Sequence, residues 1–277
     1  MVQIITDSST LYTVEEAQAL GFDLSPLCVM IGDLEGRDLQ IDMKDYYERI
    51  QRGEIPRSSQ PPIGEVMDLY EKYKGSEIIN IAMADGLSGT YQSACGARET
   101  MDNKEDITVF NSKTLCGPHR YMVEKAQKMK MAGCAKKEIL DWLNQAAEKS
   151  ESFLIPQDFA FLRRGGRLTP MAAALGSVLK LKPVMTLTED CKKLDKFTIK
   201  RTMKSAVKAV IDHLKEKKLD KRHILYVSHA DALEDAKNVV SQLKETFKDL
   251  EIHILELGAV FVAQGGPQCI AIQYIEK

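Results

Sequence analysis

Apolar and polar positions along the chain follow a recurring order. A short run of aliphatic residues ends at a turn rich in glycine, serine or aspartate, and a stretch with the period of an amphipathic helix follows. The clearest example is the run Ile78–Met83, which is followed by a short Gly-Ser-Gly-Thr turn within Gly86–Thr90 and then at once by a helix-forming segment. Strand, turn and helix in this rhythm predict an α/β fold with a largely parallel sheet.

The pattern divides the chain into two predicted α/β domains, 1–158 and 159–277, the first with a largely parallel Rossmann-like sheet. No low-complexity linker marks the boundary, so we expect the domains to share a tight interface. In the first domain we predict strands at Val2–Ile5, Ser25–Ile31, Ile78–Met83 and Ile107–Phe110, and helices at Val14–Leu20, Met43–Gln51, Gly64–Tyr73, Arg120–Met131 and Lys136–Lys149. In the second we predict strands at Ser152–Ile155, Ile224–Val227, Ile252–Leu255 and Cys269–Ile275, and helices at Met171–Lys180, Thr202–Glu216 and Leu233–Thr246.

The turn after Ile78–Met83 is the first candidate site. It places the hydroxyls of Ser88 and Thr90 and the backbone of Gly89 where a helix begins, and the N–H groups there attract an anion. Neither a P-loop nor a dinucleotide-binding glycine motif follows the strand, so the pattern favours a small oxyanion such as a carboxylate. Two other interpretations stay open: a helix N-cap, worth about 1 kcal/mol, and a nucleophilic serine elbow. Thr90 stands where the elbow motif requires its second glycine.

Two further loops carry polar groups. Ser58 and Ser59 lie in the proline-rich segment Pro56–Pro62, predicted to be a rigid polar loop, which by itself is explained as a turn with capping residues. The segment Arg163–Arg167 gathers three guanidinium groups around adjacent glycines. Glycines let the backbone approach a ligand closely, and this density of charge predicts anion binding in a loop.

Other polar residues have simpler interpretations. Asp7 and Ser8 follow the first predicted strand and are interpreted as caps of the predicted helix Val14–Leu20. The five histidines belong to no cluster with metal-ligand spacing, so no metal is expected.

Composition excludes several classes of protein. The net charge of −2 provides no basic field, and no basic recognition helix is present, so nucleic acid is not an expected partner. The chain has no apolar run long enough to span a membrane and no secretory signal pattern at its start, which predicts a cytoplasmic location. Six widely spaced cysteines fit this location, because they are expected to be reduced.

Taken together, five motifs resemble the signatures of the DegV family of bacterial fatty-acid-binding proteins. They occur in the family's order and span nearly the whole chain: Thr6–Ser9, Ser58–Pro61, Leu87–Ala94, Phe161–Arg167 and Leu181–Pro183. Each motif is weak alone, and five in register make a strong match. The resemblance implies two α/β domains with a long-chain fatty acid bound at the domain junction and its tail in an apolar tunnel.

The resemblance also implies roles for individual residues. Ser58 and Ser88 would hydrogen-bond the carboxylate, and Arg167 would lie beside the head group as its charge partner. Arg201 and Thr202 resemble a basic site that faces a partner kinase. The complete fatty-acid-binding set implied in this way is Ser58, Ser59, Ser88, Gly89, Thr90, Arg167 and Gln264.

A partner is implied as well. In the family, a fatty-acid kinase uses ATP to phosphorylate the bound carboxylate, and the acyl phosphate passes to phospholipid synthesis. The chain would therefore be a non-catalytic carrier with no cofactor besides its fatty acid, and transient contact with a membrane would be allowed. Two alternatives come from other classes: a Ser88-centred acyl- or phosphoryl-transfer enzyme, and a lipid-sensing regulator.

One position departs from the family pattern. Gln264 stands where many relatives carry a histidine before Gly-Pro-Gly, and Gln268 replaces the last glycine. A glutamine amide can donate a hydrogen bond to a carboxylate but neither titrates nor carries charge. Binding should survive the change, whereas a role in phosphoryl transfer that needs the histidine is in doubt.

Overall fold

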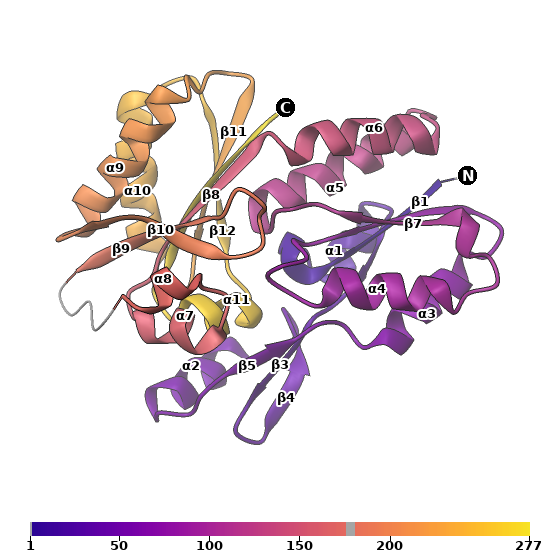
Figure 1. Cartoon of the computed structure of the whole chain (residues 1–277), viewed down its shortest axis with the longest axis horizontal. Helices are drawn as coiled ribbons and strands as arrows, with labels where there is room; N and C mark the ends of the chain where they lie inside the picture. Colours follow the sequence, from indigo (N-terminus) through magenta and orange to yellow (C-terminus); the bar gives the residue numbers. More distant parts are fainter. Residues whose placement is uncertain (1, 176–180) are drawn as a thin grey trace. The chain divides into compact units, whose positions relative to one another are not determined.

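Two compact units make up the structure. The computed structural model of the chain describes residues 2–175 and 181–277 (Figure 1). Unit 1 comprises Met1–Glu148 and unit 2 comprises Lys149–Lys277. The position near residue 158 that the sequence favoured as a boundary lies within unit 2, between its first strand and its first helix.

The principal sheet of unit 1 is parallel, which confirms the predicted fold class. Its four strands run in the order β2-β1-β6-β7. The chain moves from β1 to one neighbour and later from β6 to the opposite edge, so the topology reverses between β1 and β6. The strands are β1 (Val2–Asp7), β2 (Asp23–Ser25), β6 (Glu77–Ala82) and β7 (Ile107–Asn111).

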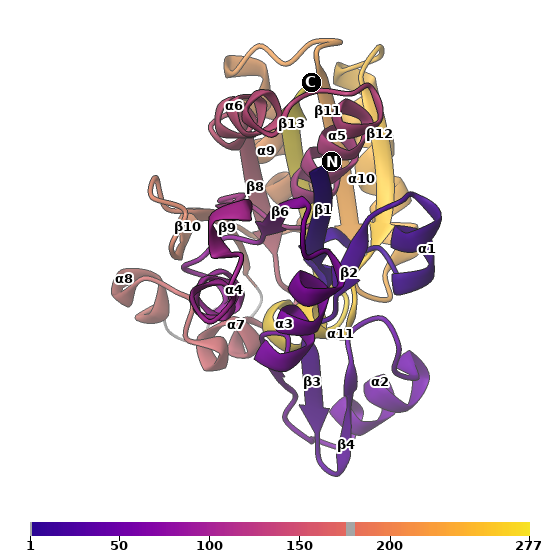
Figure 2. The same cartoon turned by 90° about the vertical axis from the view of Figure 1, so that its right-hand side faces the viewer.

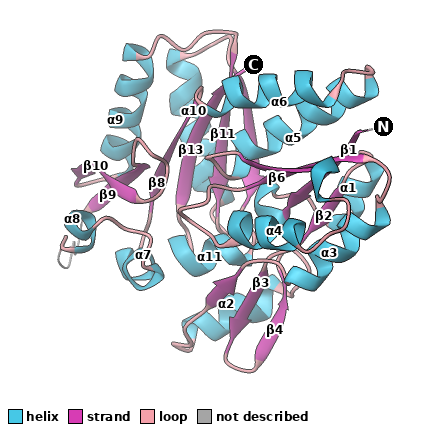
Figure 3. Cartoon of the chain, turned by 45° about the vertical axis from the view of Figure 1, so that its right-hand side comes forward, coloured by secondary structure: helices cyan, strands magenta, loops and turns pink. Residues whose placement is uncertain are grey.

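Helices cover this sheet on both sides, as Figure 3 shows for α3 and α4 on one side and α5 and α6 on the other. The apolar side chains of Ile5, Ile78 and Ile107 form one buried cluster with residues of α3 and α4. Alternate strand residues point to opposite faces, so aliphatic strands with two buried faces read as continuous apolar runs. The helices are α1 (Val14–Ala19), α3 (Ile63–Lys72), α4 (Thr90–Glu99), α5 (Cys116–Met131) and α6 (Lys136–Ala147), with 3₁₀ turns η1 (Ser8–Thr10) and η2 (Lys104–Asp106).

Unit 1 also contains a small antiparallel sheet with strand order β4-β3-β5, close to helix α2 (Met43–Gln51) in Figure 2. Its strands are β3 (Cys28–Ile31), β4 (Leu34–Arg37) and β5 (Arg57–Ser59). Two predictions were wrong here. The single strand predicted at Ser25–Ile31 is divided between two sheets at Pro26, because proline has no N–H to donate to a ladder. The predicted loop Pro56–Pro62 contains β5, a mostly exposed strand without an apolar pattern.

The caps of the first helix also differ from the prediction. Thr13 caps α1, accepting a hydrogen bond from the Glu16 amide, while the Glu16 side chain accepts from the Thr13 amide. Asp7 instead caps the short turn η1. The capping interpretation of Asp7 and Ser8 for Val14–Leu20 was therefore wrong, since a capping box closer to the helix satisfies its first N–H groups.

Unit 2 is built on a six-stranded mixed sheet in the order β10-β9-β8-β13-β11-β12. Among its described strands, β11 and β12 pair in parallel and the other neighbours pair antiparallel. The long amphipathic helices α9 and α10 pack on one face of this sheet and form its main buried cluster (Figure 1). The elements are β8 (Ser150–Ile155), β9 (Lys182–Leu187), β10 (Leu194–Lys200), α9 (Met203–Glu216), β11 (His223–His229), α10 (Leu233–Thr246), β12 (Glu251–Glu256) and β13 (Ile270–Glu276).

Three short helices of unit 2 differ from the sequence prediction. The segment Arg163–Arg167, predicted as a loop, begins inside α7 (Phe159–Gly165), which Asp158 caps at its start. The predicted helix Met171–Lys180 is observed only as α8 (Pro170–Ala173), and its last part, 176–180, lies outside the described residues. Helix α11 (Ala259–Gly265) was not predicted, because its residues are almost all buried and show no polar period.

A buried hydrogen-bonded pair links α3 to the centre of the parallel sheet. The Asn80 amide Nδ2 donates to the Tyr70 hydroxyl over 2.8 Å, and that hydroxyl donates to the Ala94 carbonyl over 3.3 Å. Both side chains are buried. We expect Tyr70→Phe to lower the free energy of unfolding by about 1–3 kcal/mol, because it leaves the Asn80 amide buried without an acceptor. Urea denaturation measures the loss.

The matched control removes both partners. In the double variant Tyr70→Phe/Asn80→Val the buried amide is gone, so stability should recover relative to Tyr70→Phe. A double variant with a free energy of unfolding no higher than that of Tyr70→Phe would contradict this account.

Candidate functional site

The candidate site of unit 1 lies at the carboxyl ends of β1 and β6. These neighbouring parallel strands flank the point where the strand order reverses, and in open α/β sheets such a point is the usual place for a ligand. The segment after β1 is η1, and the segment after β6 is the loop Met83–Gly89 that leads into α4. The sequence-predicted turn therefore lies at the edge of the sheet where a ligand is expected.

Ser88 stands just before the first turn of α4. Its hydroxyl is 2.8 Å from the Thr90 hydroxyl and accepts a hydrogen bond of 3.3 Å from the Thr90 amide. The N-cap residue is Gly89, which has no side chain to satisfy the first-turn amides. Within Ser88–Thr90, the segment interpreted as a helix N-cap, the cap position is therefore Gly89, and the Ser88 hydroxyl accepts from the amide of the first helical residue. Within residues 2–175 and 181–277, no imidazole or carboxylate is hydrogen-bonded to Ser88.

The structure brings the second serine segment of unit 1 to the same place. Ser58 and Ser59 lie on β5, and the side chain of Gln60, the next residue, reaches Gly89. A Cβ atom built on Gly89 would lie 3.1 Å from the Gln60 Oε1 atom, tighter than ordinary van der Waals contact. Two segments far apart in the sequence thus meet at the start of α4, with glycine as the residue that fits between them.

A buried histidine is hydrogen-bonded to the ends of β1 and β6 at this edge of the sheet. His119 on α5 is fully buried, with its Nδ1 atom 2.8 Å from the Ser9 hydroxyl and its Nε2 atom 3.1 Å from the Ile81 carbonyl. A carbonyl only accepts, so Nε2 carries the proton and Nδ1 accepts from Ser9. Burial lowers the pKa of His119 below its ordinary value of 6.5, and the nearby carboxyl group of Asp7 partly opposes that shift.

Unit 2 brings two other predicted residues together. Arg167 follows the left-handed Gly166 that ends α7, and its Nη1 atom donates to the Gly165 carbonyl. Gln264 on α11 lies against the same glycine, because a Cβ atom built on Gly165 would be 2.2 Å from the Gln264 Oε1 atom. No larger residue fits at position 165 without displacing that glutamine side chain.

The three arginines predicted in one loop are not all in a loop. Arg163 and Arg164 lie on the last turn of α7, and the Arg164 guanidinium stacks 4.5 Å from the centre of the Phe161 ring. Only Arg167 extends from the loop that follows. The prediction failed because glycines after a short helix serve as its C-cap, a signal that resembles a glycine-rich binding loop.

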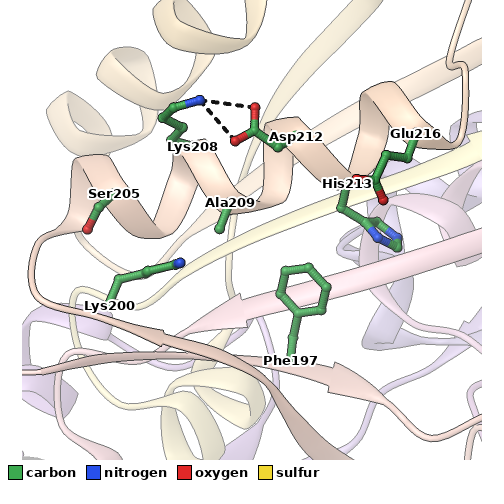
Figure 4. A pocket seen from close by; sticks show the side chains of 8 residues that line it. All are labelled: Phe197, Lys200, Ser205, Lys208, Ala209, Asp212, His213 and Glu216. Carbon is green, nitrogen blue, oxygen red and sulfur yellow. Dashed lines mark hydrogen bonds and ion pairs between the residues drawn. The ribbon is translucent and has the colours of Figure 1, made fainter.

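The two residues expected to face a kinase lie elsewhere in unit 2, in the connection from β10 to α9. Thr202 caps α9 and accepts from the Ser205 amide over 3.1 Å. A groove of about 460 Å³ lies beside this connection between β10 and α9. Figure 4 shows its lining residues, among which Lys208 is paired with Asp212 on the helix: Phe197, Lys200, Ser205, Lys208, Ala209, Asp212, His213 and Glu216.

The described residues contain neither a cluster of metal ligands nor a helix suited to span a membrane. Outside 1 and 176–180, no group of three or more histidine, cysteine, aspartate or glutamate residues could hold a metal ion. Within the same ranges, no helix is both long enough and apolar enough to cross a membrane.

The sequence did not reveal that the polar residues next to the site are buried and hydrogen-bonded to one another. Asp7, Ser9 and His119 are all at most 2% exposed, yet Asp7 was interpreted as a helix cap, and neither Ser9 nor His119 had an assigned role of its own. The available signal was an uninterrupted polar run, Thr6–Thr10, at the end of an aliphatic strand. Solvent-exposed turns and buried polar clusters have the same residue composition, so the sequence alone did not separate them.

Comparisons with known proteins agree with this architecture. The family model described as "Uncharacterised protein, DegV family" matches residues 1–277. Protein DegV of Bacillus subtilis (strain 168) is 30% identical over 284 residues, which cover 100% of this chain and 99% of that protein.

Solved structures are similar over the same length. The crystal structure of DegV, a fatty acid binding protein from Bacillus subtilis, superposes with a TM-score of 0.86 at 29% identity, covering 100% of this chain and 99% of that one. A DegV family protein from Thermus thermophilus, described by its fatty acid binding, superposes with a TM-score of 0.90 at 23% identity and the same coverage. At 23% identity, the similarity to the Thermus thermophilus protein shows that the fold is shared and nothing more.

The buried histidine predicts a pH dependence of stability. Because burial lowers the pKa of His119, the unfolded chain binds a proton at this position more readily than the folded protein. The free energy of unfolding should therefore be highest above about pH 6.5 and fall as the pH drops, by up to about 1.4 kcal/mol per pH unit for one proton. Denaturant unfolding between about pH 7.5 and pH 5.5, each about one unit from the ordinary histidine pKa, measures the slope.

The variant His119→Gln isolates this contribution. It lacks the titrating group, so its stability should change less over the same range even if it is lower throughout. Burial also lowers the pKa of His229, which is why the difference between the two slopes, and not the wild-type slope alone, is the test. Equal slopes would show that folding does not lower the pKa of His119, which would contradict this prediction.

Proposed function

The chain belongs to the DegV family, and on that premise we propose that it binds a long-chain fatty acid and holds the carboxylate with the hydroxyl groups of unit 1. The observation that carries the proposal is the contact between the two serine segments. Gln60 reaches Gly89, so the segments that contain Ser58 and Ser88 lie together at the edge of the sheet where ligands bind. The DegV protein of Bacillus subtilis, described as a fatty acid binding protein, supports it by likeness at 29% identity.

The proposed head-group set draws on residues of both units. Ser58 and Ser88 hydrogen-bond the carboxylate, and Arg167 balances its charge. Gln264 donates from its amide, in place of the histidine of many relatives. The remaining members of the set, Ser59, Gly89 and Thr90, shape the site around the ligand, and an apolar tunnel receives the tail.

Affinity comes mainly from the tail. A sixteen-carbon chain withdrawn from water gains about 0.8 kcal/mol per methylene group, or about 11 kcal/mol. Immobilising the ligand costs several kcal/mol of this gain. The head-group residues therefore fix orientation and prevent the burial of an unpaired carboxylate, which would be costly.

We further propose that the chain is a carrier that presents its fatty acid to a kinase for acyl-phosphate formation, with Arg201 and Thr202 facing that partner. A cytoplasmic location and a role in phospholipid metabolism belong to the same proposal. The alternative of a Ser88-centred enzyme needs a general base, and among the described residues the hydrogen bonds of the Ser88 side chain lead only to Thr90. A serine-reactive probe discriminates, because labelling at Ser88 would favour the enzyme.

Native mass spectrometry tests binding directly. We expect the purified protein to carry a mass increment of one fatty acid, which is lost on denaturation and identifies the preferred chain. A ligand-free spectrum that stays unchanged after incubation with hexadecanoic and octadecenoic acids would refute the proposal.

The role of Ser88 is tested by head-group selectivity. Displacement of a bound fluorescent fatty acid gives the affinities of hexadecanoic acid and of 1-hexadecanol, and their ratio reports the carboxylate contacts alone. Ser88→Ala should lower this ratio about tenfold, the value of one hydrogen bond to a charged group. It should weaken phosphorylation by a partner kinase more than it weakens retention of the lipid.

The control for this variant is Ser76→Ala. Ser76 precedes β6, whereas Ser88 follows it, so the same substitution at the opposite end of the strand should leave the ratio unchanged. Complete loss of lipid from a folded Ser88→Ala protein would contradict the assignment of affinity to the tail.

Gln264 predicts a flat pH profile for binding. With no ionisable group at this position, affinity for hexadecanoic acid should change little between about pH 6 and pH 7.5, where a histidine would titrate. Gln264→His should introduce an inflection in that range. An inflection in the wild-type protein would show that another group near the carboxylate titrates.

A further inference from the structure

We propose that the turn Asp7–Ser9 at the end of β1 is a positioning unit that sets the places of both serine segments of the carboxylate site. The proposal rests on the proposed function, because it concerns how Ser58 and Ser88 are held for the same ligand. Its residues do not touch the ligand themselves. They act through the backbone of the segments that do.

Asp7 positions the segment that contains Ser88. Its Oδ2 atom accepts a hydrogen bond of 2.9 Å from the amide of Met83, the first residue of the loop that leads to Ser88. Its Oδ1 atom accepts one of 2.9 Å from the Ser9 amide, which keeps the carboxyl group aimed at the loop. The next loop amide, that of Ala84, donates to the Thr114 carbonyl over 2.9 Å. The first two residues of the loop are thereby hydrogen-bonded to two different segments of unit 1.

Ser8 positions the segment that contains Ser58. Its hydroxyl accepts a hydrogen bond of 3.1 Å from the Leu27 amide and donates one of 2.9 Å to Asp38. Leu27 directly precedes β3, and β3 pairs with β5 in a register that places Val29 opposite Ser58. A displacement at Leu27 is therefore transmitted along the ladder to Ser58.

Ser9 completes the turn by connecting it to the middle of unit 1. Its hydroxyl donates to Nδ1 of His119, whose Nε2–H donates to the carbonyl of Ile81 on β6. Three consecutive side chains thus reach three different segments, and all three are at most 2% exposed.

The burial of these three polar side chains indicates that they position the serine segments and do not mainly stabilise the fold. A buried polar network rarely stabilises a fold more than apolar side chains of the same volume would, whereas it does fix one arrangement of the segments it joins. Hydroxyl donors serve a carboxylate only within the narrow range of hydrogen-bond distances, so a shift of about 1 Å in either segment is enough to lose the contact.

The test compares variants of the turn with a matched control in the same head-group assay. Asp7→Asn keeps the size of the side chain but replaces one of its two acceptor oxygens with an NH₂ group, so the amides of Met83 and Ser9 can no longer both donate to it. Ser8→Ala removes the acceptor for Leu27. The control is Asp23→Asn, since Asp23 is also buried but accepts from Lys72 and Tyr73. The readout is the affinity ratio of hexadecanoic acid to 1-hexadecanol for each folded protein.

We expect Asp7→Asn and Ser8→Ala each to lower this ratio about fivefold to tenfold, the value of one hydrogen bond, and Asp23→Asn to leave it unchanged. Double variants identify the route of each effect. Asp7→Asn should add little to Ser88→Ala, and Ser8→Ala should add little to Ser58→Ala, whereas the crossed pairs should be additive.

Each other outcome counts against a stated claim. A ratio that falls with Ser88→Ala but not with either turn variant overturns the positioning role while leaving the proposed function intact. An equal fall with Asp23→Asn shows a general effect of instability and also overturns it. A wild-type protein that does not prefer the acid overturns both. If Asp7→Asn does not fold, Ser8→Ala with its double variants decides the question.

Discussion

A carboxyl group buried at the end of a parallel strand needs hydrogen-bond donors from nearby backbone, and this requirement organises unit 1. Asp7 meets it with the amides of Ser9 and Met83, which lie in its own turn and in the loop after the neighbouring strand. Without such donors the cost of burying the group would be several kcal/mol. These hydrogen bonds therefore hold the ends of β1 and β6 together at the edge of the sheet where the strand order reverses, which is where ligands of α/β folds bind.

Each unit contains one glycine whose backbone lies close to the side chain of a glutamine. Gly89 faces the side chain of Gln60 in unit 1, and Gly165 faces that of Gln264 in unit 2. In both places a Cβ atom would enter the space of an amide oxygen. The glycines of the two family motifs thus have a packing reason that is independent of ligand contact. In each unit the candidate head-group residues stand next to this glycine, so their local surroundings depend on a small residue as much as on polar groups.

The fold was predictable where a local pattern and tertiary burial agree. Helices α2 and α10 are observed at the predicted bounds, because each has one apolar face and one polar face. Strand β5 and helix α11 were missed for opposite reasons. The first is a mostly exposed strand of polar residues that exists through its pairing with β3, and the second is so deeply buried that no polar side marks its period. Local propensity carries no information about either circumstance.

The sequence by itself determined the α/β class, the family and the identity of the serine turn, because these follow from short-range patterns and motif order. Only the tertiary structure decided which polar residues are buried, and so separated Asp7 and His119 from ordinary turn residues. It also decided that Gln60 meets Gly89 and that Gln264 meets Gly165. The reason is physical: residues with the same local preference acquire different roles according to the groups that surround them, and those groups come from distant parts of the chain.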